Sequence, residues 1–570
     1  MANNEAANEI ISTDVLIIGG GIGGLVTAVK AKEADPAVDI LVVEKQTAGW
    51  AGKATKIGGI LAFLEPEKNA GKFLDFQVRT SGLYLNDQDL LLKYVQSSHK
   101  AIEDLDTWGV KFARTPDGKI LSFPNNFAPE LSMTFVDIDL MLRIRSKAHQ
   151  LGVKFLDKIH VVDLLKQDST VVGAVGFGIV TGEYFVFKAK ATVLANGSCG
   201  YKVRRFWVAG TGDGIAAAYR AGAEMRNAEY GNLYGHTVYQ DTDGGMVGHQ
   251  FLVNSKGENL AQKYLPDSGP TGVFLPVPLA VGLEKEVAEG RGPIRFAPPP
   301  ARGGGYPKMD LPRLNDWSQR MAEKEAKYGL PPGSEREISI PLHGETSCVK
   351  VDHEMRTSLK GLWAIGDTSY AGSAVAGAVC SPPGITPGAG ILFAVISGTW
   401  AGPSAVRYVA ETQSRHTTSA SSEIQGFKQR IFKPLERSTG VLPGDVINSL
   451  QEITAPIKYN LRRSKARLEE ALKVLENLKG RLPELQAKDL HYLSKCHEVA
   501  SMVLCAELTY RAALKREESR GSHYREDFPQ RDDKQWLKWV IITNRNGEMN
   551  LTTQPVPVAT YQVQPAGDRQ

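Results

Sequence analysis

Two short apolar runs near the N-terminus predict neighbouring buried strands with a helix between them. Residues 14–18 are continuously apolar after Asp14, and residues 39–43 are apolar after Asp39. Residues 25–34, between them, read as a helix that packs close to the first strand. A continuous apolar run of this length is typical of a parallel strand that is covered on both faces. The pattern therefore predicts a strand, helix, strand unit and an α/β domain.

Three later apolar segments extend this prediction. Residues 191–195 and 362–365 read as further short strands, and residues 391–400 as an apolar helix. Both predicted strands end in small or polar residues, Asn196 and Gly197 after the first and Gly366 and Asp367 after the second. We expect these strand ends to belong to the same sheet as the N-terminal unit.

In the C-terminal third, apolar residues recur with the period of an α-helix instead of forming short continuous runs. Residues 461–482 and 485–515 place apolar side chains at i, i+3 and i+4 with charged faces, which predicts an amphipathic helical bundle. A polar stretch at 411–422 reads as the linker before it. A coiled-coil dimer is the alternative, although Gly480 and Pro483 interrupt the run.

Composition and charge exclude several classes of protein. The 570 residues are 42% apolar and 23% charged with a formal net charge of +4, which indicates a multidomain globular protein and no nucleic-acid binder. The five cysteines form no C-x-x-C pair, so we expect no metal site and no iron–sulfur cluster from this chain alone. We find no signal peptide and no apolar run of about 18 residues, and expect a cytoplasmic location without a transmembrane segment.

A glycine-rich turn follows the first predicted strand. Gly19, Gly21 and Gly24 occupy the three positions of G-x-G-x-x-G, and Glu44 ends the second strand about 20 residues later. The glycines permit a tight turn, close approach of a pyrophosphate and close helix packing, while the carboxylate suits the ribose hydroxyls. The order of these elements predicts a dinucleotide site, and Glu44 argues against NADP.

Segments farther along resemble a known flavoprotein family. Residues 55–60 resemble the Gly-Gly loop, and residues 210–215 the T-G-D-G-I element, of the flavoprotein subunits of succinate dehydrogenases and fumarate reductases. Residues 516–529 are similar to their R-x-E-S-R-G-x-H-x-R-x-D-x-P signature. Residues 171–190, 290–294 and 487–491 most resemble the alpha subunit of dissimilatory adenylylsulfate reductase. The resemblance spans almost the whole chain.

The resemblance implies FAD as the cofactor and an order of domains. The expected fold is α/β: a Rossmann-like FAD-binding domain at 1–229 and 353–425, an inserted α+β capping domain at 230–352, and a C-terminal helical bundle at 426–570. The residues expected to bind FAD are Gly19, Gly21, Gly23, Gly24, Glu44, Lys45, Gly58, Gly59, Ala195, Asn196, Gly197, Asp213, Gly366, Asp367 and Gly388.

The chain departs from this family at three places. No histidine lies between residues 40 and 98, and Gly52 and Lys53 stand where the family's covalent flavin histidine is expected, so FAD should be bound non-covalently. Residues 380–390 and 276–280 contain no arginine where the dicarboxylate enzymes carry theirs. Phe63 stands where adenylylsulfate reductases have an asparagine. These departures argue against fumarate as the substrate and weaken the interpretation of the chain as an adenylylsulfate reductase, because guanidinium groups recognise both anions.

Three residues are the catalytic candidates. His343 matches the family histidine on the substrate side of the flavin, where an imidazole binds an anion or donates a proton. His236 lies close to the place of a substrate histidine in the dicarboxylate enzymes, and Arg291 is a cation that attracts anions. The alternative for His343 is a packed or capping histidine, and for His236 a loop histidine whose hydrogen bonds are all made within the protein. The alternative for Arg291 is a solvated or structural arginine.

The resemblance also implies a partner. A flavin takes up two electrons and passes them on, and the family delivers them through a small ferredoxin-like iron–sulfur subunit. We therefore expect an FAD-dependent oxidoreductase that transfers electrons between a small, anionic substrate and such a partner. The alternatives are a fumarate or enoate reductase with a rewired pocket, and a non-catalytic electron-transfer flavoprotein. The Arg516–Asp533 region reads as an ion-pair network that locks the last helix to the body.

Overall fold

The computed structural model describes most of the chain. The described residues are 8–55, 59–125, 128, 130–203, 210–231, 237–238, 252–266, 277–296, 309–328, 336–339, 345–370, 389–412 and 421–565.

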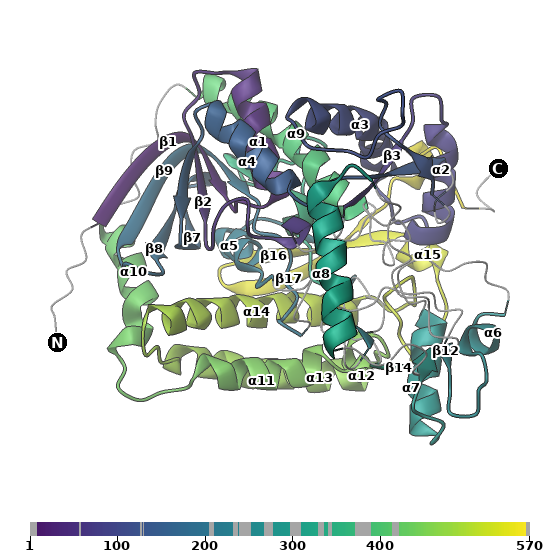
Figure 1. Cartoon of the computed structure of the whole chain (residues 1–570). Helices are drawn as coiled ribbons and strands as arrows, with labels where there is room; N and C mark the ends of the chain where they lie inside the picture. Colours follow the sequence, from purple (N-terminus) through teal and green to yellow (C-terminus); the bar gives the residue numbers. More distant parts are fainter. Residues whose placement is uncertain are drawn as a thin grey trace.

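The largest sheet contains every strand that the apolar runs predicted (Figure 1). Its order is β6-β2-β1-β9-β8-β7, and β15 also pairs with β9. The parallel pairs are β1–β2, β1–β9, β2–β6 and β9–β15. The antiparallel pairs are β7–β8 and β8–β9. The bounds are β1 (Asn8–Ile18), β2 (Ile40–Glu44), β6 (Lys154–Asp157), β7 (Ile159–Gln167), β8 (Thr170–Gly178), β9 (Tyr184–Leu194) and β15 (Leu362–Ala364).

Helices cover this sheet and pack closely on each other. α1 (Ile22–Ala34) lies against α9 (Ala389–Glu411), with α3 (Gln88–Thr107) and α4 (Leu140–Gln150) beside them. A Cβ at Gly398 would lie 2.7 Å from the carbonyl oxygen of Gly23, so the missing side chain permits the contact. α9 is longer than the predicted 391–400 and continues through Pro403. By length and composition it is apolar enough to cross a membrane, but 67% of its most apolar stretch is buried inside the protein.

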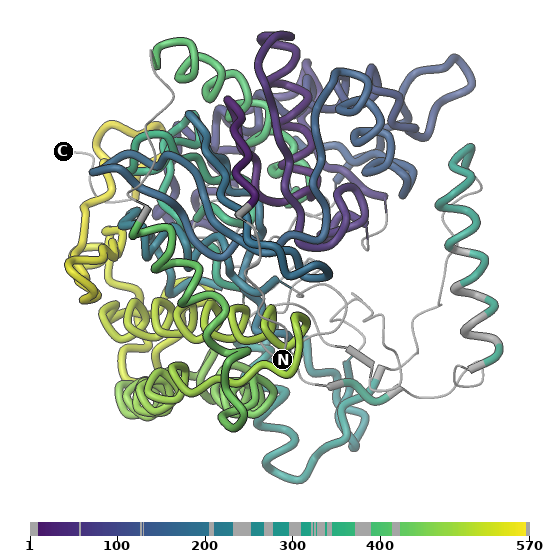
Figure 2. The backbone as a smooth tube through the Cα atoms, turned by 90° about the vertical axis from the view of Figure 1, so that its left-hand side faces the viewer, coloured from purple at the N-terminus to yellow at the C-terminus, as the bar shows by residue number. Residues whose placement is uncertain are grey.

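A second, smaller sheet contacts the N-terminal end of a helix from the inserted region. Strands β3 (Ile60–Leu64), β4 (Phe123–Pro124) and β5 (Leu131–Phe135) form a small antiparallel sheet near α2 (Ala70–Phe76). The N-terminal end of α8 (Pro312–Tyr328) docks beside it through Leu314, whose backbone N–H donates to Asp137 Oδ1 at 2.8 Å. Figure 2 shows the rest of α8 standing away from the body.

The inserted region mixes helices and strands, as the predicted α+β capping domain requires. Strands β11 (Thr237–Val238), β14 (Arg336–Ser339), β13 (Arg295–Phe296) and β12 (Leu252–Val253) pair in that order. Helices α6 (Leu260–Tyr264) and α7 (Val277–Ala288) accompany them and share a separate small core.

The C-terminal helices form the predicted bundle under the main sheet (Figure 1). They are α10 (Ser421–Phe432), α11 (Pro443–Thr454), α12 (Ile457–Asn460), α13 (Lys465–Arg481) and α14 (Leu490–Lys515). The apolar stripe of α13 faces inward, with Leu468, Ala471, Leu475 and Leu478 buried. α13 begins four residues later than predicted, because the Ser464 side chain caps it.

The C-terminal region contains more than the helical bundle that the sequence predicts. After the short α15 (Asp533–Trp536), β16 (Lys538–Arg545) and β17 (Glu548–Pro555) form an antiparallel hairpin that pairs with β10 (Met225–Arg226). Its turn is Asn546-Gly547, and both residues have positive φ, at 55° and 89°. Asn-Gly is the strongest short sequence signal for such a turn, so the signal was present in the sequence.

Candidate functional site

The glycine turn has the geometry that a dinucleotide site requires. Gly19 has φ +114°, and a Cβ there would lie 2.4 Å from the carbonyl oxygen of Ala195. A Cβ at Gly24 would lie 2.0 Å from the carbonyl oxygen of Gly19, so these two glycines allow strand, turn and helix to touch. A Cβ at Gly21 would meet no atom within 4 Å. Gly21 therefore faces open space at the site where the motif places a pyrophosphate.

The start of α1 is suited to an anion. Gly21 is its N-cap residue and offers no side chain to the first backbone N–H groups. These groups carry the positive end of the helix dipole. Beside them, Glu44 accepts from Gly20 N–H and from Gln46 N–H, both at 2.7 Å. A carboxylate has further lone pairs for a ribose hydroxyl, so the residues present fit FAD at this end.

The other strand ends lie at the same edge of the sheet. Because β1, β9 and β15 are parallel neighbours, Ala195, Asn196 and Gly197 follow β9 next to Gly366 and Asp367 after β15. The Thr368 side chain joins the two turns through the backbone of Gly197. The buried Asn196 Oδ1 accepts no hydrogen bond from the described residues. Ligands of open α/β sheets bind at this edge.

Lys45 and Asp213 meet in a charged cluster that also includes Glu498 of α14. Asp213, the first residue of α5 (Asp213–Ala221), and Glu498 each receive a hydrogen bond from Lys45 Nζ at 2.7 Å. Burial opposes the charge of Lys45, yet the two carboxylates raise its pKa. Burial alone would raise the pKa of Asp213, but Lys45 holds it below the ordinary value. This cluster ties the predicted FAD residues to the C-terminal bundle.

Two histidines next to this cluster, the buried His160 and the partly buried His497, make the stability of the protein acid-sensitive. Burial lowers the pKa of His160 and of His497 to about 4, from an ordinary value of 6.5. Both are neutral in the folded protein, whereas the unfolded chain binds protons below pH 6.5. Each should therefore cost about 1.4 kcal/mol of unfolding free energy per pH unit as pH falls from 6.5 to 4. Urea unfolding at a series of pH values measures this slope. His497→Phe should reduce it, and an unchanged slope would contradict the assignment.

Lys53 connects three segments around the predicted flavin. It lies in the short 3-10 helix Lys53–Thr55, and its ammonium contacts Glu345 Oε2 and, at 2.6 Å, Asp367 Oδ2. The Glu345 side chain is fully buried. In the sequence, Lys53 stands out only because it occupies the region of the covalent histidine. The structure shows it as the cation that pairs with both carboxylates.

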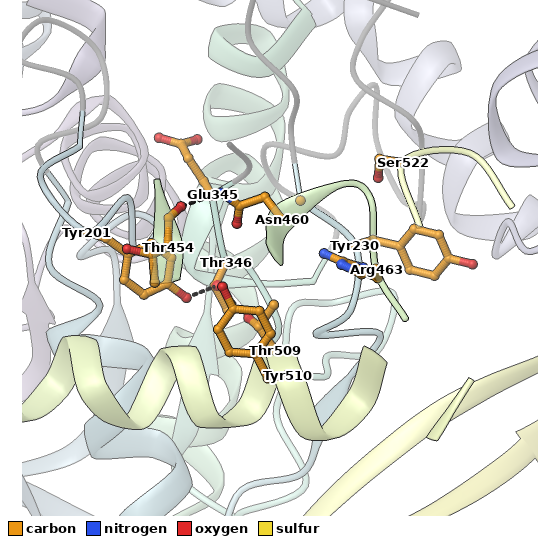
Figure 3. A pocket seen from close by; sticks show the side chains of 11 residues that line it. Tyr201, Tyr230, Glu345, Thr346, Thr454, Asn460, Arg463, Thr509, Tyr510 and Ser522 are labelled. Atoms are coloured by element: carbon orange, nitrogen blue, oxygen red, sulfur yellow. Dashed lines mark hydrogen bonds between the residues drawn. The ribbon is translucent and has the colours of Figure 1, made fainter. Parts of the chain in front are cut away.

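Glu345 and the next residue, Thr346, line a polar pocket (Figure 3). The space inside it is about 20 Å³, enough for about one water molecule. Hydroxyl groups dominate its wall, and Thr346 Oγ1 lies 2.6 Å from Tyr201 OH and 2.8 Å from Thr509 Oγ1. The described residues that line it are Tyr201, Tyr230, Gly231, Glu345, Thr346, Thr454, Asn460, Arg463, Thr509, Tyr510 and Ser522.

Four predicted site residues lie outside the described part of the chain: His343, His236, Gly58 and Gly388. Glu345, which lines the pocket, is two residues after His343 in sequence. Gly59 is described, and a Cβ there would lie 2.0 Å from the carbonyl oxygen of Val136. A Cβ at Gly23 would lie 3.1 Å from Ile365 Cδ1, so Gly23 packs closely against Ile365.

Arg291 forms ion pairs with two glutamates of the inserted region. It forms a bidentate pair with the buried Glu286 at 2.6 and 3.0 Å and also contacts Glu289. Glu286 receives further hydrogen bonds from Asn254 and Tyr264 in the same small lobe. These contacts favour the structural alternative over the catalytic role that was predicted for Arg291.

Comparison with known proteins agrees with this geometry. The model of an FAD binding domain matches residues 14–241, and that of the fumarate reductase flavoprotein C-terminus matches residues 449–569. Together they cover more than half of the chain. One of the subunits of the CoM/CoB fumarate reductase from Methanothermobacter marburgensis is 27% identical, over 94% of this chain and 98% of its own.

Solved structures share the fold. Escherichia coli quinol fumarate reductase superimposes with a TM-score of 0.81 at 20% identity, covering 97% of this chain and 98% of its own. Adenylylsulfate reductase from Archaeoglobus fulgidus gives 0.76 at 21% identity, covering 97% of each chain. With the glycine turn, the strand-end loops and the C-terminal network in place, the chain belongs to the succinate dehydrogenase and fumarate reductase flavoprotein family and is an FAD-dependent oxidoreductase.

Proposed function

We propose that this chain is the flavin-bearing subunit of an electron-transfer pair, moving electrons between a small anionic substrate and a separate iron–sulfur protein. The observation that carries the proposal is the distribution of cysteines. The described Cys199, Cys348, Cys496 and Cys505 are all buried free thiols, and the described residues contain no group of ligands able to hold a metal. Electrons on the flavin therefore need a separate carrier, which is a redox protein, a nicotinamide, a quinone or oxygen, and the family resemblance favours the redox protein.

FAD supplies the redox chemistry when it is bound, and the chain's residues hold and orient it. The α1 N-terminus binds its pyrophosphate, Glu44 binds the ribose at its adenosine end, and the turns at Asn196 and Asp367 bind the part between the pyrophosphate and the flavin ring. The relative from Methanothermobacter is named as one subunit of its enzyme, which supports an assembly with other chains. The cytoplasmic location expected from the sequence is part of this proposal.

A test of the partner is electron exchange without oxygen. The oxidised, FAD-loaded chain is mixed with reduced bacterial ferredoxin, with NADH or with a quinol, while flavin absorbance is followed. We expect ferredoxin to reduce the flavin at least tenfold faster than NADH or the quinol. Rapid reduction by NADH and none by ferredoxin would contradict an iron–sulfur partner.

Reduction of fumarate or another enoate is the second candidate. The support is that relatives at 24–27% identity, covering most of the chain, carry the names of fumarate reductases. The missing arginines at 276–280 and 380–390 are the argument against it. For such a reaction FAD would supply the hydride when bound, and a residue of this chain would have to donate a proton to the other carbon of the double bond.

Removing the charge of Lys53 should weaken FAD binding. In Lys53→Met, Glu345 and Asp367 lose the ammonium between them, and two uncompensated carboxylates next to the cofactor disfavour the negatively charged reduced flavin. We expect FAD affinity to fall about 10- to 100-fold, the value of one charged hydrogen bond, and the flavin midpoint potential to become more negative. Fluorescence of released FAD and a redox titration measure these changes.

Two variants control for this effect. Lys53→Arg should retain most of the affinity, and Lys72→Met, which removes an ammonium 3.8 Å from Glu130 with 69% of its side chain exposed, should change neither quantity. An unchanged dissociation constant and potential in Lys53→Met would show that Lys53 does not act on the flavin.

A further inference from the structure

Two of the side chains that line the polar pocket carry a buried polar atom with no hydrogen-bond partner among the described residues. These atoms are Nε of Arg463 and Oγ of Ser522. Arg463 is 4% exposed and Ser522 is 3% exposed, so bulk solvent does not reach either of them freely. Leaving a buried polar atom unpaired is costly, and native proteins pair nearly all such atoms. The two atoms therefore indicate a small bonding partner inside the pocket.

The charge of Arg463 does not require an anion as that partner. Arg463 Nη1 donates to the backbone carbonyl of Glu229 at 2.7 Å and lies 2.8 Å from His523 Nδ1. Burial lowers the pKa of Arg463 to about 10, and nearby groups, the Glu229 carboxylate among them, oppose that shift. Glu229 thus compensates the guanidinium electrostatically. What Nε lacks is a hydrogen-bond acceptor, which a neutral molecule can provide.

The size and the lining of the pocket match one water molecule. Its space of about 20 Å³ exceeds the roughly 10–15 Å³ that a water occupies by this measure, and a buried water needs two to four polar partners. A water that accepts from the Arg463 Nε–H has both hydrogens left to donate. Ser522 Oγ is an acceptor on the wall, and Glu229 Oε2 is a further buried oxygen without a partner in the described part of the chain.

The pocket lies where three parts of the chain meet. Tyr230 and Gly231 precede the inserted region in sequence, Thr346 follows it, and Arg463 and Ser522 belong to the C-terminal region. Figure 3 shows Arg463, Tyr230 and Ser522 on one side of the pocket and Thr346 on the other. A molecule in this space therefore contacts both segments that flank the inserted region.

We propose that the pocket is a binding site for one ordered water molecule, which accepts a hydrogen bond from Arg463 Nε and bonds to Ser522 Oγ. The water is part of the folded structure and joins the C-terminal region to the two segments that flank the inserted region. A buried water of this kind is nearly as good a partner as a direct hydrogen bond. The proposal depends neither on the substrate nor on the redox partner.

The direct test is a crystal structure of the FAD-loaded full chain at a resolution that shows ordered waters. We expect a water oxygen about 2.7–3.2 Å from both Arg463 Nε and Ser522 Oγ. A pocket without density would overturn the site, and so would a structure in which Arg463 Nε bonds directly to a carboxylate.

Two variants of Ser522 test the site in solution. Magnetic relaxation dispersion of water counts the internal waters with long residence times. The methyl groups of Ser522→Val should expel the water and lower that count by one, whereas Ser522→Ala leaves the space and the Arg463 donor and should keep it. Ser522→Val should then unfold at lower urea than Ser522→Ala, because Nε loses its partner. In a dry pocket valine would instead fill space and be the more stable of the two. That reverse order with an unchanged count would overturn the site.

Ser519→Val is the matched control in the same segment. Ser519 lies three residues before Ser522 in sequence, donates to the carbonyls of Arg525 and Phe528 at 3.1 and 2.8 Å, and does not line the pocket. It should leave the count of internal waters unchanged. Loss of one water in both valine variants would attribute the effect to the segment as a whole and overturn the site.

Discussion

Gly21→Ala is expected to abolish tight FAD binding while leaving the apoprotein as stable as the wild type. Gly21 has φ −71° and ψ −178°, which any residue adopts, and a Cβ there meets no polypeptide atom within 4 Å. The methyl group would instead occupy the space against which a pyrophosphate lies. Losing backbone hydrogen bonds to that charged group weakens affinity on the order of 100-fold. Fluorescence titration of the apoprotein with FAD measures it.

Gly24→Ala separates this effect from a defect in folding. Its Cβ would lie 2.0 Å from the carbonyl oxygen of Gly19, so helix α1 must move away from the turn. Overpacking of this kind costs about 1–3 kcal/mol, which urea unfolding of the apoprotein detects. If Gly21→Ala destabilises the apoprotein as much as Gly24→Ala, or binds FAD normally, the turn does not hold the cofactor as we describe.

Arg516→Met is expected to destabilise the folded chain strongly. Arg516 and Glu229 are fully buried and paired at 2.7 Å, and Arg516 also bonds to Glu518 at 2.8 Å. It donates further to the carbonyls of Trp536 and Lys538, at 3.1 and 2.7 Å. Removing one partner of a buried ion pair leaves an uncompensated charge and costs about 3–5 kcal/mol. Urea unfolding followed by tryptophan fluorescence measures the loss.

Arg531→Met is the control in the same segment. Arg531 forms an ion pair with Asp533 at 3.0 Å, lies 5.6 Å from the centroid of the Tyr84 ring, and has 39% of its side chain exposed. Surface pairs contribute about 0–1 kcal/mol, so its loss should be small. Similar losses in the two variants would show that the buried network does not lock the C-terminal region to the body.

Features whose signal lies in adjacent residues were predictable from the sequence. The strands at 14–18 and 191–195 follow from uninterrupted apolar runs, and the glycine turn from fixed spacing. The Arg516–Asp533 segment was predicted to be an ion-pair network, and Arg520 indeed bonds to Glu518 and Asp533 within it. The hairpin at Asn546-Gly547 carries an equally local signal, although the helical period of the preceding residues does not extend to it.

The polar core of the site was not predictable in this way. Lys53 meets residues 292 and 314 positions away in the sequence, and Arg463 meets His523, which is 60 positions away. No periodicity or motif joins such positions, because the fold alone brings them together. A single lysine or arginine in sequence is most often a solvated surface charge. Only its burial and its partners reveal another role.

The most direct test of the central claim is reoxidation of the reduced flavin by a small anion. The dithionite-reduced, FAD-loaded chain is mixed without oxygen in a stopped-flow instrument with adenylylsulfate, fumarate and a panel of other enoates. The account predicts that at least one of these anions reoxidises the flavin at a catalytically useful rate. If no anion reoxidises the flavin while ferredoxin exchanges electrons quickly, the chain relays electrons without a substrate of its own, and the account is wrong.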